Sequence, residues 1–198
     1  MKSILSFIVL LSILIVGCSD PVLSPKPRAF PKVELPEKTY QKFSGDFCDF
    51  TFNYPQYATI QQDKYYFDEQ TPHECWFDIN VPQVNGKIHC SYVPLDKKIN
   101  TLDEMRSDAF QLVGKHNLKA SYIDELPIEK PDGTFGYAFD IEGPVASPFQ
   151  FFLTDGEKHF LRGALYFNTQ AKPDSLAPMY DFMKTDIMEL INTLEWTN

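Results

Sequence analysis

The sequence is poor in the features that mark membrane-spanning, nucleic-acid-binding and metal-binding proteins. After its start it has no apolar run of about 18 residues, the length that a membrane-spanning helix needs. Only 18 Lys and Arg stand against 27 Asp and Glu, so the net charge is −9 at pH 7 and nucleic acid is not expected as a partner. The histidines lack the spacing of metal ligands, so no metal site is predicted: they are His73, His89, His116 and His159.

Motifs of known catalytic chemistry are also missing. The chain has no nucleophile elbow, no His-Glu-x-x-His pair, no phosphate-binding loop and no acidic calcium loop. Reactive residue types meet at His73-Glu74-Cys75, where Cys75 and a distant histidine could form a thiol nucleophile and its base. A half-cystine that opens a strand explains this cysteine more simply. We therefore predict no enzymatic activity and no cofactor, with a thiol-dependent enzyme as an alternative.

The chain begins with a secretion signal. Residues 4–16 form an almost unbroken apolar run that is too short to span a bilayer core of ~30 Å. The run leads into an Ile-Val-Gly-Cys ending at Cys18, which resembles the lipobox of bacterial lipoproteins. In that class the cysteine is acylated, becomes the mature N-terminus and anchors the protein stably to a membrane. We expect a signal peptide over 1–17 and, because Ser19 follows the cysteine, a location on the periplasmic face of the outer membrane.

Residues 18–40 are predicted to form a tether. They have no apolar periodicity and carry prolines in a pattern typical of a semi-extended spacer: Pro21, Pro25, Pro27, Pro31 and Pro36. Alternatively, the segment from Val33 onward packs on the domain. The remaining residues, 41–198, suffice for one domain with a single core and are few for two.

Alternating apolar residues predict strands that pair in tight hairpins. The turns are expected at Asn85-Gly86, Asp132-Gly133 and Asp155-Gly156. A two-residue turn at Asp132-Gly133 places Ile128 opposite Tyr137 on the neighbouring strand. Such hairpins indicate a mainly antiparallel sheet.

Two amphipathic helices are predicted beside these strands. The first opens at a Thr101/Glu104 capping box, and the second extends over about 175–195, with Asp174 or Ser175 as its cap. Strand hairpins with one helix inserted and another at the end describe an α+β domain. This order of elements resembles the Mog1/PsbP-like α/β/α sandwich.

Three cysteines remain after lipidation, in a compartment that permits disulfides. If Asn85-Gly86 is a two-residue loop, Val81 lies opposite Cys90, which puts Cys75 and Cys90 roughly 20 Å apart along the strands. A disulfide cannot bridge that distance. Cys48 and Cys75 each begin a strand on its apolar side. We therefore predict the disulfide Cys48–Cys75, with Cys90 a buried free thiol.

A distinctive strand pattern lies within residues 147–167. Four of these residues alternate and share one strand face: Phe160, Arg162, Ala164 and Tyr166. In the simpler interpretation, Arg162 pairs with a carboxylate such as Asp140 or Glu142 and makes the sheet rigid. In the functional interpretation this face docks a partner, and the candidate partner-binding residues are Phe160, Arg162 and Tyr166.

Several longer strings resemble the gliding motility lipoprotein GldD family of the Bacteroidetes. Beyond the lipobox they are Pro25-Lys26-Pro27-Arg28, Phe50-Thr51-Phe52-Asn53-Tyr54-Pro55, Cys75-Trp76-Phe77, Asn85-Gly86-Lys87-Ile88-His89, residues 146–167 and Ile191-Asn192-Thr193-Leu194-Glu195-Trp196. The resemblance implies a cell-envelope lipoprotein that is required for gliding motility and associated with type IX protein secretion. It implies other gliding and secretion lipoproteins as partners and no enzymatic activity. Only the lipidated Cys18 transfers as a functional residue.

Two classes of function therefore remain for the envelope domain. One is a non-enzymatic interaction or assembly component. The alternative is a periplasmic ligand-binding lipoprotein whose aromatic-rich sheet holds a small apolar or glycan ligand. A sheet that is covered on both faces and leaves no cavity would count against ligand binding.

Overall fold

The computed structural model describes residues 34–66 and 69–197. The predicted signal peptide and most of the predicted tether lie outside these residues. In chain order the elements are β1 (Tyr40–Phe43), β2 (Phe50–Pro55), β3 (Thr59–Gln62), β4 (Tyr65–Tyr66), β5 (Glu69–Gln70), β6 (Trp76–Val81), η1 (Pro82–Val84), β7 (Gly86–Pro94), α2 (Leu102–Gly114), β8 (Tyr122–Glu129), β9 (Phe135–Glu142), β10 (Phe149–Thr154), β11 (His159–Phe167), α3 (Pro173–Thr193) and β12 (Glu195–Trp196).

A seven-stranded sheet dominates the domain, in the strand order β3-β6-β7-β11-β10-β9-β8. A second, three-stranded sheet has the order β1-β2-β12, so it joins the start of the domain to its end. All the strand pairs are antiparallel. The predicted α+β class with a mainly antiparallel sheet is confirmed.

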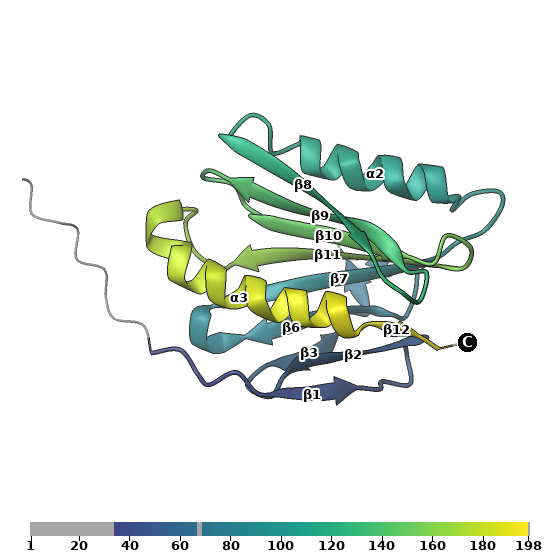
Figure 1. Cartoon of the computed structure of the whole chain (residues 1–198), viewed down its shortest axis with the longest axis horizontal. Helices are drawn as coiled ribbons and strands as arrows, with labels where there is room; N and C mark the ends of the chain where they lie inside the picture. Colours follow the sequence, from purple (N-terminus) through teal and green to yellow (C-terminus); the bar gives the residue numbers. More distant parts are fainter. Residues whose placement is uncertain (1–33, 67–68, 198) are drawn as a thin grey trace, which may run out of the picture. The chain divides into compact units, whose positions relative to one another are not determined.

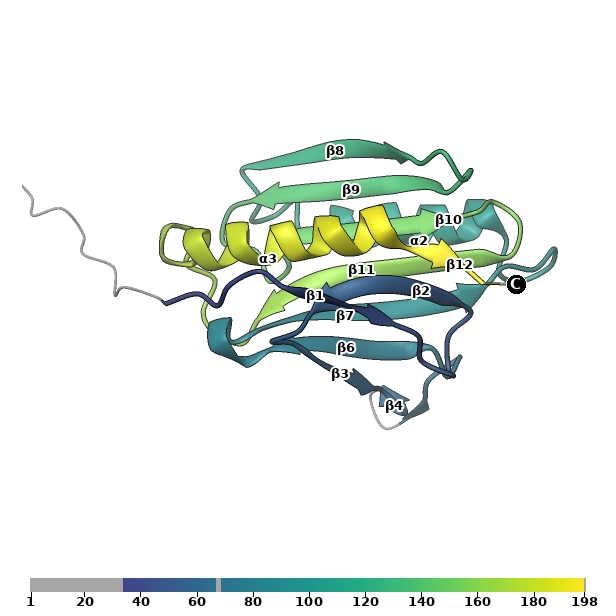
Figure 2. The same cartoon turned by 60° about the horizontal axis from the view of Figure 1, so that its bottom comes forward.

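Different layers cover the two faces of the large sheet (Figures 1 and 2). The helix α3 and the three-stranded sheet lie on one face, over a core that includes Phe77, Leu165 and Ile187. The helix α2 lies on the other face, where Val113 packs with Phe152 and their neighbours. Because side chains alternate along a strand, each residue of the large sheet belongs to one of these two sides.

The turn between β6 and β7 differs from the prediction. Residues Pro82–Val84 form a 3-10 turn that ends at Asn85, whose φ is 50°. Val81 therefore pairs with Gly86 and not with Cys90, so the predicted register is wrong. The physical reason is Pro82, which has no N–H to donate to a strand ladder and so ends β6 at Val81.

The register of the β8–β9 hairpin is shifted by one residue from the prediction. Ile128 pairs with Gly136 and not with Tyr137. The N–H of Lys130 donates to the carbonyl of Thr134 at 2.8 Å, so the turn encloses three residues and not two. A third turn residue moves every partner along β9 by one position.

The two helices begin in different ways. At α2 the predicted capping box is confirmed, because the Thr101 hydroxyl accepts the N–H of Glu104 and the Glu104 carboxylate accepts the N–H of Thr101. The helix α3 begins at Pro173, after an N-cap Lys172 that has no side-chain cap. The predicted caps Asp174 and Ser175 are therefore wrong. Proline suits the first helical position because its missing N–H would have no helical partner there.

The folded domain begins before residue 41. The Lys38 ammonium donates to Asp186 at 2.7 Å and to the carbonyl of Phe182 at 2.6 Å. The hydroxyls of Tyr40 and Tyr57 donate to the same carboxylate at 3.0 and 2.7 Å. Burial lowers the pKa of Lys38 and raises that of both tyrosines. From Lys38 on, the predicted tether is thus part of the domain, which corrects its boundary at residue 40.

Candidate functional site

Cys48 and Cys75 form a disulfide, the pair that the sequence predicts. Their Cα atoms are 5.0 Å apart, and the bridge joins the segment before β2 to the start of β6. The register argument behind the prediction does not hold. The N–H of Tyr92 donates to the carbonyl of Cys75, so Cys75 lies opposite Tyr92 and only two positions from Cys90. Packing of the small sheet on β6, and not separation along the hairpin, brings Cys48 to Cys75.

The groups that could have formed a thiol site are engaged or buried. Cys90 is a fully buried free thiol, and burial raises its pKa. His73 accepts a hydrogen bond from the N–H of Cys75 at 3.1 Å. Within the described residues, therefore, no thiol is both free and exposed.

One face of the large sheet is only partly covered. On the side of α2, no described helix lies over β7, β6 and β3 (Figures 1 and 2). Cross-strand pairing places one set of side chains on this surface, which we call the open strip: Gln61, Trp76, Asp78, Asn80, Lys87, His89, Ser91 and Arg162. All except Asp78 are half-buried or exposed. The alternate residues of β6 and β7 point to the α3 side and are almost all buried, so the strip is the outer surface of this half of the sheet.

Asp78 is the centre of a charge network in the open strip. Its carboxylate accepts a hydrogen bond from Lys87 at 2.5 Å and lies 2.8 Å from Nδ1 of His89. Burial alone would raise the pKa of Asp78, but the hydrogen bonds to His89 and Lys87 outweigh it and hold the pKa below its usual value. The second carboxylate, Asp63, lies 3.4 Å from the same His89 nitrogen. Its pKa is raised by burial and by the charge of Asp78.

This cluster also has the composition of a metal-ligand set. One ligand atom each of Asp63, Asp78 and His89 lies within 4.8 Å of the others. Carboxylates and an imidazole suit several divalent cations. The Lys87 ammonium, however, already supplies a cation to Asp78. We therefore describe the cluster as an ion-pair network that orients the polar groups of the strip.

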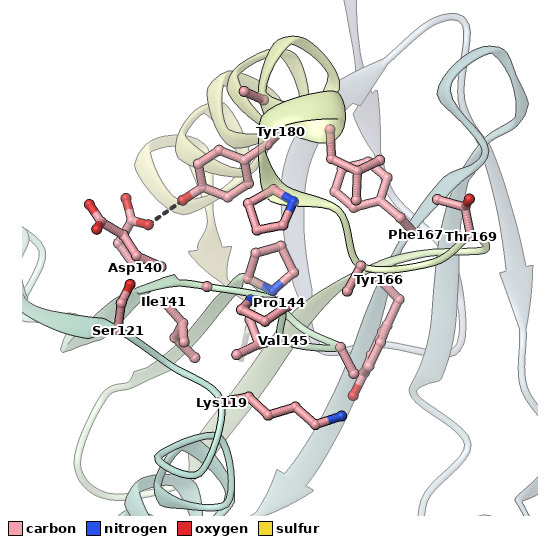
Figure 3. Close-up of a pocket in the computed structure, with 18 residues that line it drawn as sticks. Lys119, Ser121, Asp140, Ile141, Pro144, Val145, Tyr166, Phe167, Thr169 and Tyr180 are labelled. Atoms are coloured by element: carbon pink, nitrogen blue, oxygen red, sulfur yellow. Dashed lines mark hydrogen bonds between the residues drawn. The ribbon is translucent and has the colours of Figure 1, made fainter. Parts of the chain in front are cut away.

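Two of the three predicted partner-binding residues lie outside the open strip. Phe160 is buried on the α2 side, with its ring stacked on Phe152 at 5.1 Å between centroids. It cannot contact a partner without unfolding of this core, which removes it from the candidate surface. Tyr166 is half-buried at the end of β11, where its ring lines a cavity (Figure 3).

Arg162 lies at the boundary between α2 and the open strip. Its guanidinium donates to Gln150 Oε1 at 2.6 Å. The predicted pairing with Asp140 or Glu142 is wrong, because the alternation along β9 places both carboxylates on the α3 side of the sheet. Arg162 is half-buried and remains at the edge of the candidate surface.

An apolar cavity of about 670 Å³ opens beside the first turns of α3 (Figure 3). Aliphatic, proline and aromatic groups dominate its lining, which includes Pro144, Val145, Leu176 and Phe167. The volume lies within the ~300–1,000 Å³ of typical small-molecule sites. Sequence reasoning missed it because its walls come from the α2–β8, β9–β10 and β11–α3 connections and the adjoining ends of β9, β11 and α3, which meet only in the fold.

Of the two carboxylates in the cavity wall, that of Asp140 is already compensated. Asp140 accepts a hydrogen bond from the Tyr180 hydroxyl at 2.6 Å and another from the Lys184 ammonium. Burial and this hydrogen bond raise the pKa of Tyr180. Apart from this pair the wall is mainly neutral and apolar, with two further charged residues in its lining, the exposed Glu142 and Lys119 (Figure 3).

A family model described as gliding motility lipoprotein GldD matches residues 20–196. The chain belongs to the gliding motility lipoprotein GldD family. No curated protein matches this GldD-family chain. Among solved structures it is similar to the PsbP protein CyanoP of the cyanobacterium Synechocystis sp. PCC 6803, with 9% identity, a TM-score of 0.45 and coverage of 87% of this chain and 99% of that chain.

Family membership identifies the protein as a lipid-anchored envelope protein of gliding motility. The predicted anchor Cys18 lies outside the described residues, so its acylation stays a prediction. Among the helices in residues 34–66 and 69–197, none is long and apolar enough to cross a membrane.

Proposed function

We propose that this GldD-family protein is a non-enzymatic interaction and assembly component of the gliding and type IX secretion machinery. It works on the periplasmic face of the outer membrane, where it docks other envelope lipoproteins of that machinery. The observation that carries the proposal is the open strip, a surface on β3, β6, β7 and β11 of the large sheet over which no helix of the described residues lies.

The residue types of the open strip are those that stabilise protein interfaces. Trp and Arg are enriched among residues that dominate binding energy, and charges of both signs give a surface electrostatic specificity. The indole N–H of Trp76 donates to the carbonyl of Tyr92 at 3.0 Å, and its ring meets His89 edge to face at 5.8 Å. Because Trp76 is already held, little side-chain entropy is lost when a partner binds.

The first test places a photo-crosslinking amino acid at Gln61, an exposed position of the open strip, in the living host. We expect crosslinks to identified gliding or secretion lipoproteins. The matched control is Thr185, which is exposed on the outer side of α3. Equal crosslinking from both positions, or none from Gln61, would contradict docking through the strip.

Added negative charge tests whether the same surface serves movement. A deletion strain that carries Thr59→Glu with Gln61→Glu, two exposed positions on the strip's side of β3 that leave the Asp78–Lys87 pair intact, is expected to lose colony spreading and secretion while the protein level stays normal. Lys97→Gln with Lys98→Gln lowers the net charge by the same two units at exposed positions outside the strip and should leave spreading and secretion intact. Normal spreading and secretion in the first strain would sink the proposal, as would normal behaviour of the deletion strain itself.

The cavity favours a second candidate function, the binding of a small apolar ligand. Within the part of the chain that the structure describes, no helix covers β7, β6 and β3 on the α2 side, and the cavity has a suitable size and lining. Native mass spectrometry of the protein purified from its host should then show a bound molecule. Ala177→Trp, which fills the cavity from its wall, should remove that mass, and Ser175→Trp, exposed on the same helix outside the lining, should retain it. An empty protein in every preparation would argue against ligand binding.

A further inference from the structure

Four parts of the domain lie at the same end of its long axis (Figures 1 and 2). They are the turn between α2 and β8, the loop between β9 and β10, the start of α3, and the first described residues, from Glu34. The chain that leads to the predicted lipid anchor therefore enters the domain at this end, which we call the anchor end.

Leu118 is the most exposed large apolar residue among those the structure describes. Its side chain is 95% exposed at the anchor end, in the turn between α2 and β8. Hydrogen bonds fix this turn, because the N–H groups of Lys119 and Ala120 both donate to the carbonyl of His116, at 2.9 and 2.8 Å. The exposure is thus built into an ordered turn. A single exposed leucine is not unusual by itself, so its surroundings decide its meaning.

The surroundings of Leu118 combine apolar surface with basic charge. Lys119 and Ser121 of the same turn line the apolar cavity, so Leu118 is next in the chain to a cavity-lining residue. Exposed lysines occur in the chain segments at the anchor end, Lys115 and Lys119 after α2 and Lys172 at the start of α3. Glu142 and Asp174 are exposed at this end as well, so the charge is mixed and the apolar contact supplies the main attraction.

We propose that the anchor end docks on a phospholipid bilayer, with Leu118 inserted at the boundary between headgroups and acyl chains. Lysines suit this position because their apolar stems can lie along the lipid while their ammonium groups reach the headgroups. The lipid anchor keeps the domain close to the surface, so a contact too weak to hold a free protein is enough to orient a tethered one. The open strip would then stand at a defined angle to the membrane.

A bilayer fits this end better than a protein partner does. Stable protein interfaces bury roughly 800 Å² on each side around aromatic and arginine anchors. The exposed groups of the anchor end are one leucine, small and proline side chains, and dispersed charges of both signs. Its aromatic rings, Tyr166, Phe167 and Tyr180, are half-buried in the cavity wall. A fluid lipid surface adapts to a single exposed leucine, and it is already present wherever the protein is anchored.

The test uses the full lipidated protein in vesicles of phosphatidylethanolamine and phosphatidylglycerol. A fluorophore is attached at Asn117→Cys, beside Leu118, and in a second sample at Glu157→Cys in the turn between β10 and β11. Both positions are exposed, and the native Cys90 is buried and should not be labelled. A quencher carried on the lipid acyl chains should quench the fluorophore at position 117 several-fold more than that at position 157.

Leu118→Glu in the Asn117→Cys background supplies the decisive comparison. Since this side chain makes almost no contact in the fold, the circular dichroism spectrum and melting temperature should not change. Quenching at position 117 should fall to the level at position 157, while the acyl anchor keeps the protein in the vesicles. Equal quenching at the two positions, or quenching unchanged by Leu118→Glu, would overturn the proposal. Quenching at position 117 that appears only after envelope proteins are added would also overturn the proposal, since the anchor end would then be a protein interface. None of these outcomes affects the crosslinking test of the open strip.

Discussion

Replacing Cys48 and Cys75 by serine is expected to lower the free energy of unfolding by about 3.5 kcal/mol. The bridge spans a sequence separation of 27 residues, and its loss frees the unfolded chain to sample many more conformations. The whole free energy of unfolding of a domain is only ~5–15 kcal/mol, so the variant should also become sensitive to proteases. Denaturant unfolding of the mature chain, with proteolysis as a second readout, measures both effects.

Cys90→Ala is the matched control for the disulfide. It also removes a buried sulfur atom, but no covalent link, and should cost about 1 kcal/mol. Reduction of the wild-type protein should reproduce the loss seen in the double serine variant. A wild-type protein that unfolds at the same denaturant concentration with and without reductant would show that the bridge does not contribute to stability.

Asp186→Ala is expected to cost about 3–5 kcal/mol, the range found when one member of a buried ion pair is removed. The Asp186 side chain is inaccessible to solvent, and that of Lys38 is only 28% exposed. Without the carboxylate, the Lys38 ammonium and the hydroxyls of Tyr40 and Tyr57 lose their shared acceptor. The first residues of the domain should then detach from α3, which hydrogen exchange at β1 would show.

Asp181→Ala, at an exposed position of the same helix, should change stability by no more than about 0.5 kcal/mol. Lys38→Met combined with Asp186→Ala should recover part of the loss, because it removes the stranded charge and keeps an apolar side chain over the Phe182 ring. Equal stability of Asp186→Ala and Asp181→Ala would contradict the view that this cluster fastens the start of the domain.

Local patterns in the sequence were enough to predict what depends on neighbouring residues. The alternation of apolar residues predicted the strands, and the Thr101/Glu104 pair predicted the start of α2, because strand faces and helix caps follow from spacing along the chain. The predicted registers of the β6–β7 and β8–β9 hairpins were wrong, because neither turn has the predicted two-residue form. Pro82 ended β6 early, and a third turn residue lengthened the β8–β9 connection.

Family membership was contained in the sequence, since it depends on strings of adjacent residues, and the lipid anchor at Cys18 is a prediction from the same kind of string. Only the tertiary structure decided which surfaces are buried under another layer and which are exposed. Phe160 and Arg162 share a strand face, yet α2 buries the first and leaves the second at the edge of the open strip. The cavity and the Asp186 cluster likewise join segments from distant parts of the chain. Burial depends on which layer packs over a residue, and that layer comes from elsewhere in the sequence.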